Sequence, residues 1–365
     1  MSLKFLRSTS NIIEFQVVLL DNSEFITAFD QKTVQGSELL DRVCEKVEVP
    51  PCYKQYFGLQ YIDREDGDVV WLNLDKEIHS RRKSKPLLYQ LAVKVFPQDP
   101  LKNMVKNMQR LILLQVKGLI NRGKFSLPVN KHALIDGFYA QAILGDFNVK
   151  RHKPGYLEDR LGVFYCPPTG INSDGNINEE DYEVMVKDLH KSHRGMTREE
   201  AVSASLDICK ELENYGAWMH YGGTDCNGNE VVFCVSLQGI RICQLKNKFP
   251  EVGEVCHNFH WRDIISMFCD NAKFHMYVAE AREKEGMACR VFRFNKGLYG
   301  YKTAQRLQLD AENHQKFFFE GNPERATIMR SMSVEAKSMN RIARSGSGQY
   351  LASKINLTLR RATLK

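Results

Sequence analysis

The sequence lacks an apolar run long enough to cross a lipid bilayer. A transmembrane helix needs about 20 consecutive apolar residues, whereas a candidate run such as Leu111–Leu114 is soon broken by Gln115 and Lys117. The N-terminus also lacks the apolar core of a signal peptide, since Lys4 and Arg7 interrupt it. We therefore expect a cytoplasmic protein rather than a secreted or membrane-spanning one.

Cysteine is plentiful, but its metal-binding and redox patterns are missing. The chain has ten cysteines and no Cys-x-x-Cys pair. A structural zinc site needs clustered Cys and His ligands at short spacing, and only Cys256, His257 and His260 come near that pattern. We expect no metal, no cofactor and mostly buried free thiols, as in a reducing cytosol. The cysteines in the most apolar surroundings are Cys209, Cys234, Cys243 and Cys289.

Positive charge is concentrated at the C-terminal end. The chain carries 51 Lys and Arg against 44 Asp and Glu, a formal net charge of +7. From Gly321 onward there are nine Lys and Arg against Glu324 and Glu335, again +7, so residues 1–320 are formally neutral. A basic tail attracts anionic lipid, nucleic acid or acidic protein surfaces without distinguishing among them. Its composition predicts flexibility.

The N-terminal quarter of the chain reads as strands with one helix. Apolar and β-branched residues at 13–20 and 25–29 flank the turn signal Asp21–Ser23, which predicts a hairpin. Leucines and valines at helical spacing predict a helix over residues 36–47. Further strands are predicted over residues 56–61, 69–74 and 87–96. This order is typical of a ubiquitin-like lobe.

Helical periodicity follows, and then strands return. Thr197 and Glu200 form the pattern of a capping box at the start of one helix. The segment 166–178 is polar, and we interpret it as an insertion. Helices are predicted within residues 111–120, 133–144, 178–190 and 197–213. Strands are then predicted over residues 231–237, 240–245, 264–269, 273–279 and 289–294, before a helix over about 299–319.

Short phrases that mix aromatic residues with glycine stand in a fixed order along the chain. They are Tyr56–Leu59, Gly145–Phe147, Pro154–Leu157 and Asn214–His220, and Ala311–Phe318 follows near the end of the last predicted helix. At these spacings they resemble the signature sequences of the FERM domain, found in the band 4.1 and ezrin-radixin-moesin superfamily. The match is closest in character to the band 4.1-like members.

This resemblance implies an α+β protein of several lobes. The first lobe would be ubiquitin-like, the second a helix bundle similar to acyl-CoA-binding protein, and the third a PH/PTB-like β-sandwich with a C-terminal helix. An N-terminal extension and a flexible basic tail would flank them. The implied boundaries are residues 1–11, 12–96, 97–213, 214–320 and 321–365.

Four patterns imitate catalytic or metal sites. Gly118–Lys124 resembles a phosphate-binding loop, but it follows a helix and continues with Phe125 instead of Ser or Thr. Cys256 and Arg262 have the spacing of a tyrosine phosphatase loop, yet bulky residues lie between them. Asn172–Asn178 resembles half of an EF-hand loop, and we favour a solvated loop over a weak calcium site. The isolated histidines, interpreted as structural, are His220, His257, His260 and His275.

The resemblance also implies three binding surfaces. Anionic lipid, including phosphoinositide, would bind basic residues of the first lobe, namely Lys76, Arg81, Arg82 and Lys83. A peptide would bind in a groove between a strand and the last helix, lined by Ile264, Ile265, Met267, Phe268, Tyr301, Ala304, Gln305 and Gln308. The tail offers candidate phosphorylation sites for basophilic kinases at Ser333 and Thr363.

These observations lead to one expected function and one alternative. We expect a non-enzymatic FERM adaptor at the inner face of the plasma membrane. It would link cytoplasmic tails of integral membrane proteins and anionic phospholipid head groups to cytoskeletal, scaffold or junctional proteins. Nucleic acid is not an expected partner, although the basic tail keeps that hypothesis open. The alternative is the targeting FERM head of a larger enzyme, such as a cytosolic tyrosine phosphatase.

Overall fold

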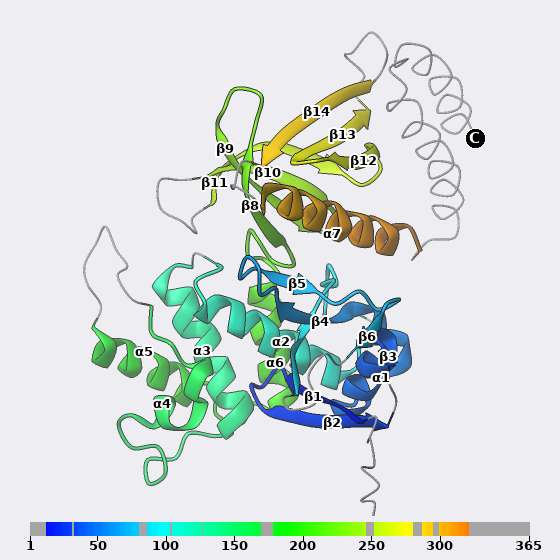
Figure 1. Ribbon diagram of the computed structural model, residues 1–365. Helices are drawn as coiled ribbons and strands as arrows, with labels where there is room; N and C mark the ends of the chain where they lie inside the picture. Colours follow the sequence, from blue (N-terminus) through cyan, green and yellow to red (C-terminus); the bar gives the residue numbers. More distant parts are fainter. Residues whose placement is uncertain are drawn as a thin grey trace, which may run out of the picture. The chain divides into compact units, whose positions relative to one another are not determined.

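The computed structural model describes most of the chain between Ile12 and Glu320. The described residues form two compact units, which divide between Tyr215 and Gly216 (Figure 1). Among the helices described, none combines the length and the apolar character that a membrane crossing requires. The described ranges are 12–30, 33–79, 86–102, 104–125, 127–168, 178–245, 252–279, 287–294 and 299–320.

The first unit opens with a five-stranded sheet. Its strands are β1 (Ile12–Val18), β2 (Glu24–Asp30), β4 (Phe57–Ile62), β5 (Val69–Trp71) and β7 (Leu87–Val93), in the order β2-β1-β7-β4-β5. Phe15 and Val17 are fully buried while their neighbours are more exposed, as expected for a sheet with one face on the core. The predicted β1–β2 hairpin is confirmed. Asn22 has φ +62°, and Asp21 Oδ1 accepts the Ser23 N–H at 3.0 Å.

One helix and a small strand pair complete this lobe. Helix α1 (Gly36–Lys46) buries Leu39, Leu40 and Val43 almost completely, which confirms the predicted helical stripe. Strands β3 (Thr33–Gln35) and β6 (Glu77–His79) pair antiparallel, and neither was predicted from the sequence. A 3-10 helix, η1 (Pro51–Tyr56), precedes β4.

The rest of the first unit is helical. The elements are α2 (Lys106–Asn121), α3 (Val129–Leu144), α4 (Tyr156–Leu161), η2 (Gly162–Phe164), α5 (Glu179–Ser192) and α6 (Arg198–Cys209). Helix α3 contacts both α5 and α6. A Cβ on Gly137 would lie 2.7 Å from Leu189 Cβ, so glycine permits the close approach of α3 and α5. The predicted capping box is confirmed, since Thr197 and Glu200 bond each other's backbone N–H groups.

The sheet and the helices of the first unit are tied by side-chain amides. Gln115 Oε1 of α2 accepts the Val93 N–H of β7 at 3.0 Å, although Gln115 is buried in an apolar stripe. Asn107 Nδ2 donates to the carbonyl oxygens of Val47 and Glu48, both at 3.0 Å. These bonds satisfy buried backbone groups where the sheet meets the bundle.

The second unit is a seven-stranded sheet closed by one helix. Its strands are β8 (Trp218–Thr224), β9 (Glu230–Ser236), β10 (Gly239–Leu245), β11 (Val252–His260), β12 (Ile264–Asp270), β13 (Lys273–Ala279) and β14 (Met287–Phe294). The order is β11-β10-β9-β8-β14-β13-β12, and all neighbouring strands pair antiparallel. Two antiparallel meanders therefore join where β8 meets β14.

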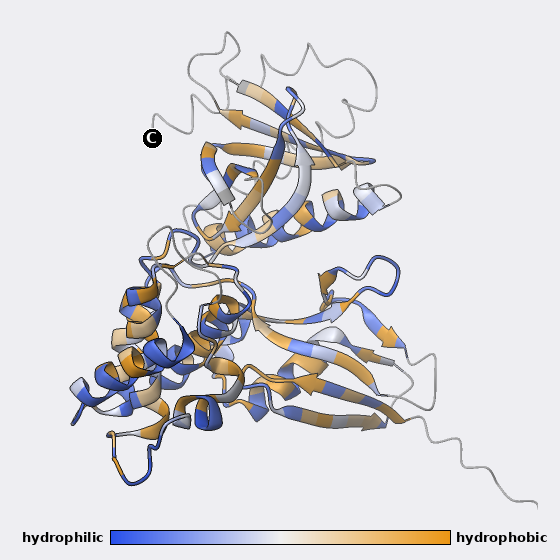
Figure 2. Ribbon diagram, turned by 90° about the vertical axis from the view of Figure 1, so that its left-hand side faces the viewer, coloured by the Kyte–Doolittle hydropathy of each residue, from blue (hydrophilic) through white to orange (hydrophobic). Residues whose placement is uncertain are grey.

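Helix α7 (Gly300–Glu320) covers the core of the second unit. Its residues Ala304, Leu307, Ala311 and Phe319 belong to the same buried cluster as the inward side chains of the strands. Burial alternates residue by residue along β13, as a sheet with one face on the core requires, and hydrophobic residues are frequent along the strands of this unit (Figure 2). The predicted fold class, an α+β protein with a C-terminal helix on a sandwich, is confirmed.

The prediction of mostly buried cysteines is wrong for several positions. Cys209, Cys234 and Cys243 are buried, but Cys289 is exposed. On β14, Ala288 and Phe292 point toward the core, so strand alternation turns Cys289 to the outer face. The other exposed cysteines are Cys52, Cys166, Cys226 and Cys256.

Candidate functional site

The outer edge of β12 and the neighbouring face of α7 form the best-supported candidate site. Strand β12 is last in the strand order of the second unit, and among the described strands only β13 pairs with it. The register shifts between Ile264 and Ser266, which marks a bulge or irregularity. An edge strand presents backbone N–H and C=O groups that a neighbouring strand would otherwise bind. We call this edge, together with Tyr301, Gln305 and Gln308 of α7, the β12–α7 surface.

Side chains of α7 take the place of a neighbouring strand along this edge. Gln308 Oε1 accepts the Cys269 N–H at 2.8 Å, and Gln315 Nε2 donates to the Ile264 carbonyl oxygen at 3.3 Å. The Cys269 thiol donates to the Ala304 carbonyl oxygen at 3.0 Å. Helix side chains thus form hydrogen bonds with backbone groups at both ends of the strand. An added peptide strand can bind the same backbone groups in place of the helix side chains.

The residues predicted to line a peptide groove fall into two groups. Ile264, Met267 and Ala304 belong to the hydrophobic core, and Ile265 is also buried. Phe268 stacks on His275 of β13 with ring centroids 4.7 Å apart. The more accessible members are Tyr301, Gln305 and Gln308, which follow one another at helical spacing on α7.

Sequence reasoning missed Gln315 and the backbone of Cys269. Gln315 stands seven residues after Gln308, so both lie on one face of α7. A helical projection of the sequence would therefore have placed Gln315 beside Gln308. The role of the Cys269 N–H has no sequence signal, because it depends on which side of β12 faces the helix.

The remaining predicted site residues are largely outside the described residues. Lys76 is exposed in the turn between β5 and β6, and its carbonyl oxygen accepts the Gly36 N–H at 3.1 Å. Three predicted lipid-binding residues and both predicted phosphorylation sites lie outside the described residues. They are Arg81, Arg82, Lys83, Ser333 and Thr363.

The two catalytic look-alikes occupy ordinary structural positions. Gly118–Lys124 spans the end of α2, where Gly123 has φ +67° and the Lys124 N–H donates to the Leu119 carbonyl at 3.0 Å, a Schellman-type helix end. Cys256 lies within β11. Burial and nearby Cys243 raise the pKa of the Cys256 thiol, whereas a phosphatase nucleophile needs a lowered one.

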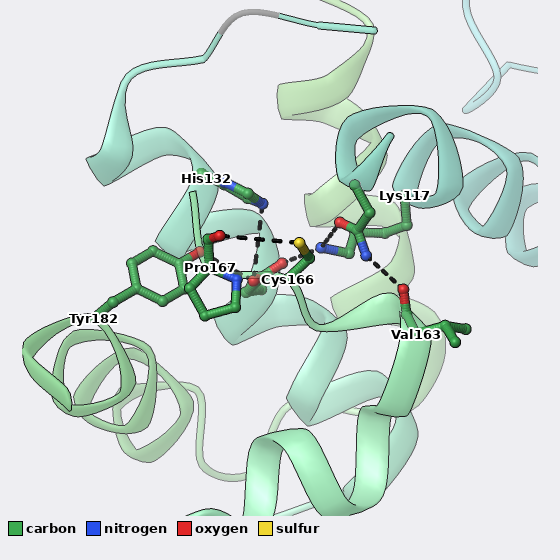
Figure 3. Close-up of polar contacts among 8 residues, drawn as sticks. Lys117, His132, Val163, Cys166, Pro167 and Tyr182 are labelled. Atoms are coloured by element: carbon green, nitrogen blue, oxygen red, sulfur yellow. Dashed lines mark hydrogen bonds and ion pairs between the residues drawn. The ribbon is translucent and has the colours of Figure 1, made fainter. Parts of the chain in front are cut away.

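A buried charge cluster lies between α2, α3 and α5 of the first unit (Figure 3). The Lys117 ammonium contacts the Asp136 carboxylate and donates to Asn121 Oδ1 at 3.2 Å. Tyr182 donates its hydroxyl to Asp136 Oδ2 at 3.0 Å, and His132 Nε2 lies 4.0 Å from the same oxygen. Lys117 and Asp136 are at most 1% exposed. Burial of a hydrogen-bonded charge pair between helices is typical of a structural cluster.

A second buried carboxylate joins α7 to β8 in the second unit. His220 Nε2 lies 2.9 Å from Asp310 Oδ2, and His314 Nδ1 lies 3.3 Å from Asp310 Oδ1. Burial alone would raise the pKa of Asp310, but His314 and His220 lower it to a net value below its ordinary range. In the described ranges, no three His, Cys, Asp or Glu side chains are grouped as a metal site requires.

The fold and this surface define a class of protein. A ubiquitin-like sheet lobe, a helical lobe and a sandwich with a C-terminal helix, in this order, make up a FERM module. Two family models agree with this assignment. The FERM N-terminal domain matches residues 17–83, and the FERM central domain matches residues 99–220.

Solved structures show the same fold. The complex of the FERM and C-terminal domains of Drosophila Merlin has 21% sequence identity and a TM-score of 0.69, and the match covers 88% of this chain and 99% of that one. The MyTH4-FERM MF2 domain of Dictyostelium discoideum myosin VII has 13% identity and a TM-score of 0.60, over 82% of this chain and 58% of that one. Human myosin 7b MyTH4-FERM, in complex with the harmonin-a PDZ3 domain, has 13% identity and a TM-score of 0.56, over 83% and 60%.

The chain belongs to the FERM-domain superfamily. The two family models together match just over half of its residues. It spans almost the whole Merlin chain but only about three fifths of the myosin chains.

Proposed function

We propose that this chain is a non-enzymatic FERM adaptor that binds the cytoplasmic tails of integral membrane proteins. The tail peptide adds as an extended strand along the outer edge of β12, beside α7. The adaptor works in the cytoplasm at the inner face of the plasma membrane and connects the bound tail to cytoskeletal or scaffold proteins. Anionic phospholipid head groups assist by binding Lys76 and its basic neighbours.

One observation supports this proposal above all: side chains of α7 form hydrogen bonds with backbone groups at the edge of β12, and a peptide backbone can form the same bonds. A peptide strand can replace the bond from the Cys269 N–H to Gln308 and the bond from Gln315 to the Ile264 carbonyl. By strand alternation, the Met267 backbone faces the same edge as Cys269. Addition of a strand to an exposed edge supplies affinity through the main chain and specificity through alternate side chains.

The proposal is tested with a display library of peptides from the cytoplasmic segments of single-span membrane proteins, selected on the full chain. Selected peptides are measured by fluorescence polarisation. Cys269→Pro removes the edge N–H at a position where proline is tolerated, and we expect peptide binding to fall at least about tenfold. Gln308→Ala removes the competitor for that N–H, so peptide binding becomes tighter.

Gln244→Ala is the matched control. Gln244 is exposed on β10, the second strand from the opposite end of the strand order, so the control should bind as the unmodified chain does. Selected peptides that bind Cys269→Pro and the unmodified chain equally well would exclude the β12 edge as their site.

A further inference from the structure

A cavity of about 520 Å³ lies among three helices of the first unit. Lys106, Arg110 and Leu113 of α2 face it at spacings of three and four residues, so they form one stripe. Helices α3 and α6 contribute similar stripes. The lining residues from these two helices are Tyr139, Ala142, Ile143, Arg198, Glu199 and Val202.

The buried lining of this cavity is mainly apolar, with Gln109 as its buried amide. Leu113 and Leu114 are 1% and 3% exposed, and Ala142 and Val202 are also buried. Ile143 is 37% exposed, which leaves an apolar side chain at the entrance on α3. The wall therefore suits a hydrocarbon chain better than a polar ligand.

The rim of the cavity is positively charged. Lys106, Arg110 and Arg198 are exposed, and Glu199 is the one carboxylate among the residues that line the cavity. In the part of the chain that the structure describes, none of the three cations forms an ion pair with a carboxylate. Lys106 Nζ instead donates to neutral oxygens, Gln109 Oε1 at 3.4 Å and Ser203 Oγ at 3.5 Å. Lys106 and Arg198 are therefore available to an anionic ligand, whereas Arg110 also interacts electrostatically with the Asp21 carboxylate, with which a ligand would compete.

We propose that this cavity binds a single-chain anionic amphiphile, such as a long-chain fatty acid or a lysophospholipid. The hydrocarbon chain packs on Leu113, Ala142 and Val202, and the acidic head group binds Arg110 and its two basic neighbours. The cavity volume lies within the 300–1,000 Å³ typical of small-molecule sites. An acidic helix from a partner protein would need an elongated hydrophobic groove, and the test below includes such a peptide as the competing occupant. The site is separate from the β12–α7 surface, so each proposal can fail alone.

The test measures binding of the fluorescent fatty acid cis-parinaric acid to the full chain, below the micelle concentration of the probe. We expect saturable binding at one site. Arg110→Gln changes an exposed side chain without affecting the core, and it should weaken binding about tenfold or more. Val202→Trp fills the cavity and should abolish binding. Competition by palmitate and by lysophosphatidate then distinguishes a carboxylate ligand from a phosphate ligand.

Lys131→Gln is the matched control, because Lys131 is exposed on α3 and does not line the cavity. Parinarate methyl ester tests the charge requirement and should bind more weakly than the acid. Three outcomes would overturn the proposal: no saturable binding, equal binding by the Arg110→Gln and Lys131→Gln variants, or equal binding of acid and ester. Binding of an acidic amphipathic peptide without any binding of parinarate would also overturn it.

Discussion

Replacing Lys117 by methionine tests whether the buried charge cluster is a structural element of the helical lobe. Methionine keeps an unbranched apolar stem and removes the ammonium group. The Asp136 carboxylate, 1% exposed, then retains the Tyr182 hydroxyl at 3.0 Å, with His132 at 4.0 Å. Neither group supplies the fixed positive charge that the ammonium provides.

The expected loss of stability follows from what remains buried. Removing one partner of a buried ion pair typically costs about 3–5 kcal/mol, because the other charge stays desolvated. The double variant Lys117→Met, Asp136→Leu removes both charges, so it should lose less stability than Lys117→Met alone. We still expect a loss of about 1–3 kcal/mol, because the Tyr182 hydroxyl no longer has an acceptor. Adding Tyr182→Phe removes the hydroxyl that has lost its acceptor and should restore most of the remaining stability. Lys131→Met, at an exposed site on α3, should stay within about 0.5 kcal/mol.

The assay is urea unfolding, monitored by hydrogen exchange and mass spectrometry of peptides from α2 and α3. A single unfolding transition is not well defined for a chain of two compact units, so local exchange reports the helical lobe directly. A structural role for the cluster is contradicted if Lys117→Met lowers the free energy of unfolding no more than Lys131→Met does. It is also contradicted if the double variant is as unstable as Lys117→Met alone.

Two further predictions concern pH and membranes. Burial lowers the pKa of His190 and, with Arg160 and Arg151, that of His152. Their stabilising contribution is thus complete above the unfolded pKa of about 6.5 and is lost as pH falls below it. The loss is at most about 1.4 kcal/mol per pH unit for the buried His190 and smaller for His152, because solvent screens a partly exposed group. Urea midpoints measured between pH 7.5 and 5 should fall for the unmodified chain and fall less for His190→Gln; parallel curves would contradict this. Lys76→Ala should weaken binding to phosphatidylserine vesicles about fivefold, since one basic residue near an anionic surface contributes about 1 kcal/mol, and an unchanged affinity in cosedimentation would exclude Lys76 from the lipid site.

Periodicity allowed most helices and strands to be predicted, because it reflects which side of an element faces the core. Helix α1 and the β1–β2 hairpin were found in this way. The same reasoning treated Lys117 as an interruption of an apolar run, yet its side chain is fully buried. Its partner Asp136 is on another helix, and a pattern along one helix does not show which charges meet across two.

The candidate site was less predictable than the fold. Alternation indicates that only one face of a strand reaches the helix, but the irregular register between Ile264 and Ser266 leaves Ile264 and Ile265 both buried. Which backbone groups lie at the outer edge of β12 depends on strand order. That order is set by packing of the whole sheet, so the bond between Cys269 and Gln308 has no signature in sequence.

The short phrases that identify the family contain residues that contact distant elements of the fold. They therefore indicate the scaffold of the protein and do not indicate its binding partner. His190 on α5 donates through Nε2 to the Gly145 carbonyl at 2.7 Å, and its Nδ1 accepts the Tyr156 hydroxyl at 3.0 Å. His220, the last residue of the phrase Asn214–His220, pairs with Asp310 of α7. These phrases thus fix one element to another that is remote in sequence. We expect changes in such contacts to destabilise the lobe, whereas changes at the proposed β12–α7 and cavity sites should alter binding and leave the core intact. Partner choice is therefore expected to vary among chains that share these phrases.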